Sequence, residues 1–192
     1  MGLHSKEFSK TIVEDLELPI TVEDFMSQAR QVFNEYRCLF MLFLFILGVK
    51  KLIDHLDSHN IPMGLATSSS KESYDMKVQN HLELFDKLKY KTWGSSDPAV
   101  KRGKPFPDVF LIAASKFPDQ PAPDKCLVFE DSINGVKAGR AAGMQVVMVP
   151  DPRLDRDLTT DATLVIGSME DFQPELFGLP DPPRLRTAIL CM

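Results

Sequence analysis

The chain has 192 residues, of which 44% are hydrophobic, and a formal net charge of -5. This length accommodates one sizeable domain, or one domain with a small appendage. The composition excludes a disordered, collagen-like or coiled-coil chain. The acidic balance argues against a nucleic-acid partner, because such a partner would require a basic stripe.

Cysteine usage indicates a reducing compartment. Cys38, Cys126 and Cys191 lie far apart in the sequence and form no C-x-x-C pair, so a disulfide framework is not expected. Residues 1–19 are polar and amphipathic, without the early apolar core of a secretory signal. We therefore expect a cytoplasmic protein.

Residues 1–37 predict helices. Thr21 precedes an acidic residue, Asp24, by three positions, which is a weak form of the capping box that opens a helix. Apolar residues then recur at three- and four-residue spacing, which predicts an amphipathic helix with a core-facing stripe. The stripe consists of Phe25, Met26, Ala29, Val32, Phe33 and Tyr36.

An apolar run, Cys38–Val49, reads CLFMLFLFILGV. It is shorter than the roughly 18 to 20 residues that span a bilayer. A buried helix or strand is the preferred interpretation, with an exposed, aggregation-prone patch and membrane association as alternatives. We expect no membrane partner.

From residue 48 onward, predicted helices alternate with predicted strands. Such alternation predicts a parallel sheet that is covered by helices on both faces. A Ser69–Glu72 capping box is expected to open the second helix. The predicted helices cover 49–60, 69–80, 106–115 and 133–142, and the predicted strands cover 61–66, 88–93, 126–129, 144–149 and 162–166.

His55 and His59 stand four residues apart in the first of these helices, a spacing that can hold a metal ion. They are surrounded in sequence by Asp54, Asp57 and Ser58. A solvated helix face is therefore preferred to a zinc site.

Polar residues follow three strand regions, at the edge of a parallel sheet where ligands bind. Thr67–Ser69 follows the first strand, Lys104 lies in a proline-framed loop, and Glu130 and Asp131 follow the strand at 126–129. Considered one at a time, each group has an ordinary structural explanation: a helix cap, a surface lysine, and two acids in the first turn of a helix. Together they suit a phosphoryl group held by hydroxyl and N–H groups, balanced by a lysine and accompanied by a divalent cation.

The segments ATSSS, GKPFPDVF and VFEDSINGV resemble motifs II, III and IV of the haloacid-dehalogenase-like phosphatase superfamily. The resemblance covers most of residues 49–180. It implies an α/β fold with a three-layer, Rossmann-like parallel sheet and a partial α-helical cap. It also implies magnesium-dependent hydrolysis of a small sugar or nucleoside monophosphate.

The resemblance implies a role for each matching residue. Thr67 and the Ser68 backbone would bind phosphate, and Lys104 would bind phosphate and balance charge during catalysis. Glu130 and Asp131 would anchor Mg²⁺.

Motif I of this superfamily is a strand followed by D-x-D, whose first aspartate is the nucleophile and whose second is the general acid and base. The only D-x-D here is Asp155-Arg156-Asp157, which follows a proline-rich turn on the C-terminal side of motif IV. We expect the chain to lack motif I, as an N-terminally truncated family member, and to be inactive as it stands. The alternative is a non-catalytic interaction or regulatory protein. A nucleotide-binding module is disfavoured, because neither G-x-G-x-x-G nor G-x-x-x-x-G-K-[ST] occurs.

In the superfamily, the motif I strand lies between the strands that carry motifs II and IV. Its loss would leave two strand edges with unpaired backbone groups, so we expect these strands to close up or the domain to be marginally stable. A further possibility is that the apolar run Cys38–Val49 covers these strand edges. The expected organisation is a partial helical cap at 1–47, an α/β core at 48–180 and a loose tail at 181–192.

Overall fold

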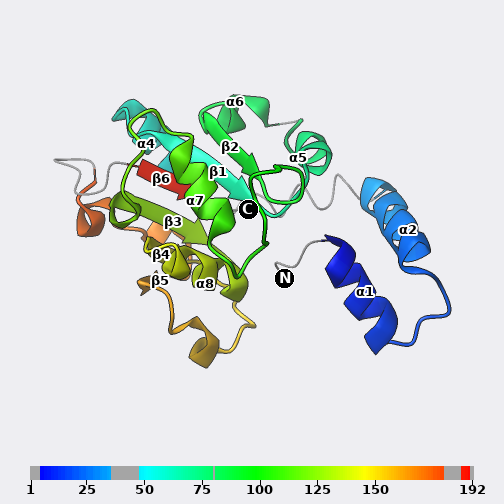
Figure 1. Cartoon of the computed structure of the whole chain (residues 1–192). Coiled ribbons are helices and arrows are strands. Elements are labelled where there is room, and N and C mark those ends of the chain that lie inside the picture. The colour runs from blue at the N-terminus through cyan, green and yellow to red at the C-terminus, as the bar shows by residue number, and fades with distance from the viewer. Residues whose placement is uncertain (1–4, 36–47, 80, 180–186, 191–192) are drawn as a thin grey trace.

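The structure is a computed structural model that describes residues 5–35, 48–79, 81–179 and 187–190. Two helices, α1 (Ser5–Asp15) and α2 (Val22–Glu35), pack against each other as a pair (Figure 1). Thr21 caps α2, since its Oγ1 accepts a hydrogen bond from the Asp24 N–H at 3.0 Å. The predicted helix is confirmed, but its core-facing stripe is wrong in part, because Val32 is 53% exposed.

Most of the apolar run at 38–49 lies outside the described residues. Its last two residues are described: Gly48 adopts a φ of 91°, and the buried Val49 begins the next helix. A Cβ on Gly48 would approach the Glu170 backbone nitrogen to 2.6 Å. Glycine is therefore required here for both its backbone conformation and its size. No helix in the described part of the chain is long and apolar enough to cross a membrane.

A six-stranded sheet lies at the centre of the α/β core, with strand order β2-β1-β6-β3-β4-β5 (Figure 1). Every strand pair in it is parallel. The strands are β1 (Met63–Thr67), β2 (Tyr90–Trp93), β3 (Cys126–Glu130), β4 (Gln145–Met148), β5 (Leu164–Val165) and β6 (Thr187–Leu190).

Helices cover the sheet on both faces, in agreement with the predicted three-layer fold. The α-helices of this part are α4 (Val49–Ser58), α5 (Lys71–Val78), α6 (Leu82–Phe85), α7 (Asp108–Ser115) and α8 (Ile133–Ala141). Short 3-10 helices are η1 (Pro123–Lys125), η2 (Arg156–Thr159), η3 (Met169–Asp171) and η4 (Pro174–Phe177).

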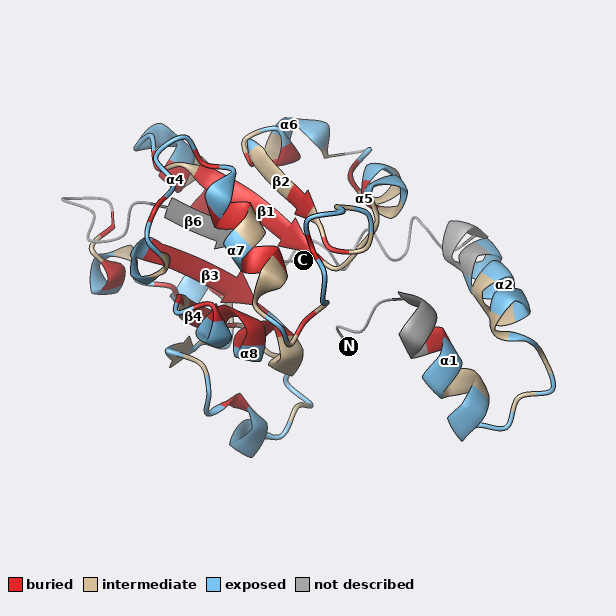
Figure 2. Cartoon of the chain, in the orientation of Figure 1, coloured by how far each residue is buried: buried red, intermediate tan, exposed pale blue. Residues whose placement is uncertain are grey.

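Two hydrophobic clusters fill the spaces between the layers. Strands β1 and β3 are buried along their length (Figure 2). Strand β3 is buried along its whole length because its residues alternate between the two clusters. Leu127 and Phe129 join the cluster under α4, whereas Cys126 and Val128 join the cluster under α7 and α8. This two-sided burial explains why β3 is a continuous apolar run in the sequence.

The place between β1 and β3 is filled, contrary to the expectation of an open gap. Strand β6 lies there and pairs with both neighbours. Leu190 is in register with Leu65 of β1 and with Phe129 of β3. Part of the expected loose tail is therefore a central strand, and the strands that carry motifs II and IV have not closed up on each other. The Phe177 and Leu179 side chains upstream of it are also buried.

Candidate functional site

Strand β1 delivers Thr67 to the carboxyl edge of the sheet. The side chain is 3% exposed, and its Oγ1 accepts a hydrogen bond from the Ser69 N–H at 3.2 Å. The Gly94 N–H donates to the Thr67 carbonyl at 2.7 Å, and the Ser95 hydroxyl donates to the Ser68 carbonyl at 2.5 Å. The loop after β2 thus fixes the backbone of the Thr67–Ser69 turn.

Helix α5 begins directly after this turn. Its N-cap is Ser70, whose Oγ accepts from the Ser73 N–H at 3.2 Å, so the predicted cap at Ser69 is wrong by one residue. Ser69 instead accepts a hydrogen bond from the Lys77 ammonium at 2.9 Å. Burial lowers the pKa of Lys77 below its ordinary value. The Lys77 amino group therefore lies beside the turn.

Lys104 lies in the loop that precedes α7 and is 6% exposed. Its ammonium stands 5.1 Å from the centroid of the Phe110 ring, within the range of a cation–π interaction. The Arg102 N–H donates to the Asp108 carboxylate at 3.0 Å, which ties the loop to the first turn of α7. The lysine predicted as a site residue is thus held within the protein and not on a surface loop.

The Lys104 ammonium donates a hydrogen bond to Oε1 of Glu130, the last residue of β3. Both side chains are buried, at 5% and 1% exposure. Oε2 of Glu130 accepts from the Ser132 hydroxyl at 3.0 Å and from the Asp131 and Ser132 N–H groups at 3.2 Å each. The Glu130 carboxylate therefore has partners on both oxygens, as a buried charge requires.

Gly135 in the first turn of α8 makes room for this carboxylate. A Cβ on Gly135 would lie 1.9 to 2.1 Å from the three atoms of the Glu130 carboxyl group, which is impossible without displacing it. Ser132 caps the same helix, since its Oγ accepts from the Gly135 N–H at 3.0 Å. The start of α8 and the position of Glu130 thus depend on each other.

Asp131 follows Glu130 and is accessible to solvent. Desolvation by the protein atoms around its carboxyl group raises its pKa, and the negative charge of Glu130 raises it further, although the Lys104 ammonium opposes this. The exposed Asp131 carboxyl group and the buried Glu130 carboxyl group thus lie next to each other in sequence at the end of β3.

The structure brings some of the predicted site residues into contact and sets others along one edge. Lys104 and Glu130 touch, and Asp131 is the next residue after Glu130. Thr67 ends β1 at the same edge, but β6 separates β1 from β3. Sequence reasoning missed the contributions of Ser132 and Gly135. The position of Ser132 directly before a helix was a capping signal, whereas nothing in the sequence indicated that Gly135 faces Glu130.

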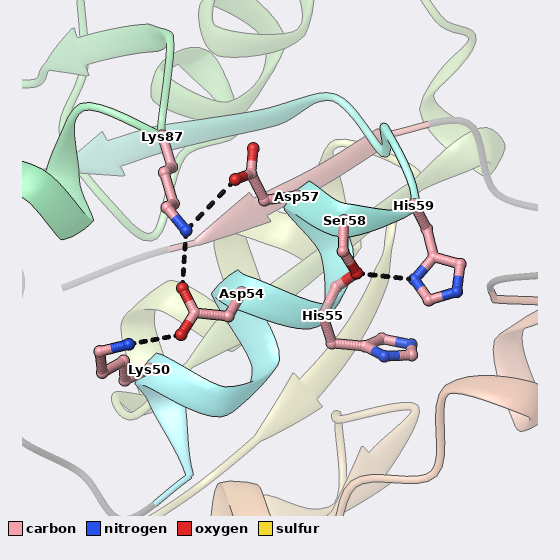
Figure 3. Close-up of polar contacts among 7 residues, drawn as sticks. All are labelled: Lys50, Asp54, His55, Asp57, Ser58, His59 and Lys87. Carbon is pink, nitrogen blue, oxygen red and sulfur yellow. Dashed lines mark hydrogen bonds and ion pairs between the residues drawn. The ribbon is translucent and has the colours of Figure 1, made fainter.

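The two histidines of α4 lie side by side, with ring centroids 4.4 Å apart (Figure 3). Nδ1 of His59 is 2.8 Å from the His55 carbonyl oxygen, and it is 3.2 Å from the Ser58 hydroxyl. Among the described residues, no group of three or more histidine, cysteine or carboxylate side chains is placed to hold a metal ion.

The opposite side of α4 carries an ion-pair network (Figure 3). Asp54 accepts from Lys50 at 2.5 Å and from Lys87 at 2.7 Å, and Lys87 also lies 3.2 Å from the Asp57 carboxylate. The hydrogen bonds from the two lysines lower the pKa of Asp54. This network connects α4 to the segment before β2, which is a structural role.

The D-x-D at residues 155–157 serves as a local cap. The Asp155 carboxylate accepts a hydrogen bond from the Asp157 N–H at 3.0 Å and so opens η2. Both aspartates are exposed. The geometry assigns this pair to a turn.

Comparison with known proteins gives three kinds of match. Residues 9–143 match the family model described as haloacid dehalogenase-like hydrolase. A Drosophila melanogaster protein named "Probable pseudouridine-5'-phosphatase" is 46% identical over 180 residues, which cover 94% of this chain and 77% of the relative. The Arabidopsis thaliana "(DL)-glycerol-3-phosphatase 2" is 42% identical over 183 residues, covering 94% and 75%.

Among solved structures, a HAD hydrolase of family IA, variant 3, from Entamoeba histolytica superposes with a TM-score of 0.68 at 26% identity, covering 87% of this chain and 75% of that one. A β-phosphoglucomutase from Clostridium difficile shares the fold with the same TM-score at 24% identity, covering 91% and 74%. The family model matches well over half of the chain, and the two sequence relatives each cover 94% of it. The chain therefore belongs to the haloacid dehalogenase-like hydrolase family.

Proposed function

We propose that the carboxyl edge of the sheet is a phosphate site for small phosphorylated metabolites. The main observation in support is the buried contact between Lys104 and Glu130. It holds a cation at the edge of the sheet where Thr67 ends β1 and Ser68 follows. In this proposal Thr67 and the N–H groups of its turn bind phosphate oxygens. Lys104 supplies the balancing positive charge and is the catalytic cation of the family reaction.

We propose Mg²⁺ at Glu130 and Asp131. Asp131 is exposed at the edge of the sheet and offers carboxylate oxygens, whereas Glu130 would have to exchange one of its present hydrogen-bond partners for the ion. Mg²⁺ prefers oxygen ligands and is held by one or two carboxylates together with substrate phosphate. When bound, the ion would neutralise charge on a phosphate group. The chain's own groups orient that phosphate and balance its charge.

The substrate class that we propose is a small sugar or nucleoside monophosphate. Its support lies in the relative named "Probable pseudouridine-5'-phosphatase", and the relative named "(DL)-glycerol-3-phosphatase 2" supports a small phosphate ester more generally. The partner of the site is accordingly a phosphorylated metabolite. We place the protein in the cytoplasm on the basis of its three dispersed cysteines.

We further propose that the chain as written binds phosphate without turning it over. The only D-x-D in the sequence is an exposed turn cap, and Cys191 follows β6 in the sequence, so no aspartate stands next to that strand. The alternative is an interaction protein whose exposed inner strand edges would recruit a partner. Those edges are not open, because β6 pairs with both β1 and β3.

Calorimetric titration of the full chain with inorganic phosphate in Mg²⁺ tests the proposal. Thr67→Val removes a hydroxyl from the site, and we expect it to weaken phosphate binding by about tenfold or more. Thr92→Val is the matched control: it alters another fully buried strand threonine, whose Oγ1 has no hydrogen-bond partner. Equal affinity in both variants would contradict the site. Hydrolysis of pseudouridine 5′-phosphate by the purified chain would contradict the proposed inactivity.

A further inference from the structure

Among the described strands, only β6 pairs with both β1 and β3, the two strands that end in residues of the candidate site. It pairs with β1 through Met63–Leu65 and with β3 through Cys126–Phe129, whereas β1 and β3 do not pair with each other. Thr67 ends β1 and Glu130 ends β3. The strand that ends at Thr67 and the strand that ends at Glu130 are therefore linked within the sheet by Thr187–Leu190.

The register places the end of β6 just below the site. Leu190 lies level with Leu65 and Phe129, which is two residues before Thr67 and one residue before Glu130. Neighbouring strands lie about 4.8 Å apart, so one intervening strand sets β1 and β3 roughly 10 Å apart. If β6 left, its neighbours would either close up or lose the backbone hydrogen bonds that hold them in place.

Within the described part of the chain, only the four residues of β6 form this link, and they lie far along the chain from both β1 and β3. Strands β1 and β3 are each followed by a helix that packs on the sheet, α5 and α8 respectively. Strand β6 is instead joined on its N-terminal side to the segment that ends at the buried Leu179. Its position thus depends on pairing with β1 and β3 and on contact with α7.

We propose that Thr187–Leu190 is a positioning element for the phosphate site, which is complete only while β6 lies between β1 and β3. The inference rests on the proposed function and deepens it. Binding and strand docking are then coupled in both directions: phosphate at the edge stabilises docked β6, and loss of β6 weakens phosphate binding.

The test uses the full chain and proline substitution. Ile189→Pro removes a backbone donor from the central strand, whereas Val165→Pro makes the same change in the edge strand β5, where proline is better tolerated. Ile189→Val serves as the conservative rescue. We expect Ile189→Pro to weaken phosphate binding by about tenfold or more, with affinity restored in Ile189→Val and unchanged in Val165→Pro. A folded Ile189→Pro protein that binds phosphate as tightly as the native chain would overturn the proposal.

If Ile189→Pro fails to fold, hydrogen exchange of the native chain, measured by mass spectrometry, tests the coupling between phosphate binding and docking of β6. Adding phosphate should slow exchange at the amides of 187–190, and chloride at equal ionic strength should not. Unchanged exchange at saturating phosphate would overturn the coupling while leaving the phosphate site intact. If the native chain binds no phosphate, the proposed function fails. In that case, hydrogen exchange of the two variants without phosphate tests the positioning role. We expect faster exchange at the ends of β1 and β3 in Ile189→Pro than in Val165→Pro, and equal exchange would overturn the role.

Discussion

The ammonium of Lys104 and the carboxylate of Glu130 form a hydrogen-bonded ion pair that is almost completely buried. The pair joins the loop before α7 to the end of β3, two segments far apart in the sequence. Both side chains are largely shielded from solvent, so the hydrogen bond between them offsets part of the cost of burying the two charges.

Removing one member of this pair should destabilise the fold strongly. Lys104→Met leaves the Glu130 carboxylate buried without its cation, and breaking such a pair typically costs about 3 to 5 kcal/mol of unfolding free energy. Urea denaturation measures the loss. In the double variant Lys104→Met/Glu130→Gln, the unpaired charge is gone and we expect part of the stability to return. A double variant less stable than Lys104→Met alone would show that the pair is not coupled in this way.

Gly135→Ala should damage the site, because the new methyl group would occupy the position of the Glu130 carboxyl. We expect loss of both stability and phosphate affinity. Gly139→Ala is a matched control in the same helix, since its methyl group would meet the Val146 side chain at 2.7 Å and not a site residue. We expect this control to lose stability only. Equal phosphate affinity in the two folded variants would argue against a role for Gly135.

Two capping serines should differ in importance. Ser70→Ala removes the cap of α5 and should cost about 1 kcal/mol, the usual value for a lost N-cap. Ser132→Ala removes the cap of α8 and also the hydroxyl that donates to Glu130, so it should cost more. Thermal or urea unfolding of the two variants gives the comparison, and equal losses would contradict the second function of Ser132.

Alkaline pH should weaken the fold through two buried acids. Burial raises the pKa of Cys126 from 9.0 to about 11 and that of Tyr74 from 10.0 to about 12, and nearby aspartates add to both shifts. The folded state then holds its protons more tightly than the unfolded state, so the free energy of unfolding falls as pH rises from about 9 to 12. Urea midpoints at pH 8 to 11 measure this slope. Cys126→Ala should flatten it between pH 9 and 11, and an unchanged slope would contradict the assignment.

Much of the α/β core follows from local sequence patterns. Strands β1, β3 and β4 were predicted within about two residues at each end because their apolar runs are buried on both faces. Thr67, Lys104 and Glu130 were found because polar residues that directly follow such runs stand out in the sequence.

Strand β6 could not be predicted in the same way. Thr187–Leu190 is four residues long and follows a proline-rich segment, so it lacks a periodic signal. Its structure comes from pairing with two strands more than 50 residues away in sequence, β1 and β3. The contact between Gly135 and Glu130 was missed for a related reason, since it depends on how α8 leaves the end of β3.

The decisive measurement is the location of phosphate bound to the chain. Amide chemical shifts of the ¹⁵N-labelled full chain, recorded during titration with inorganic phosphate in Mg²⁺, report which backbone groups respond. We expect the largest changes at Thr67, Ser68, Ser69 and Asp131, at the carboxyl ends of β1 and β3. Saturable changes centred elsewhere in the chain, or no saturable change at all, would contradict it.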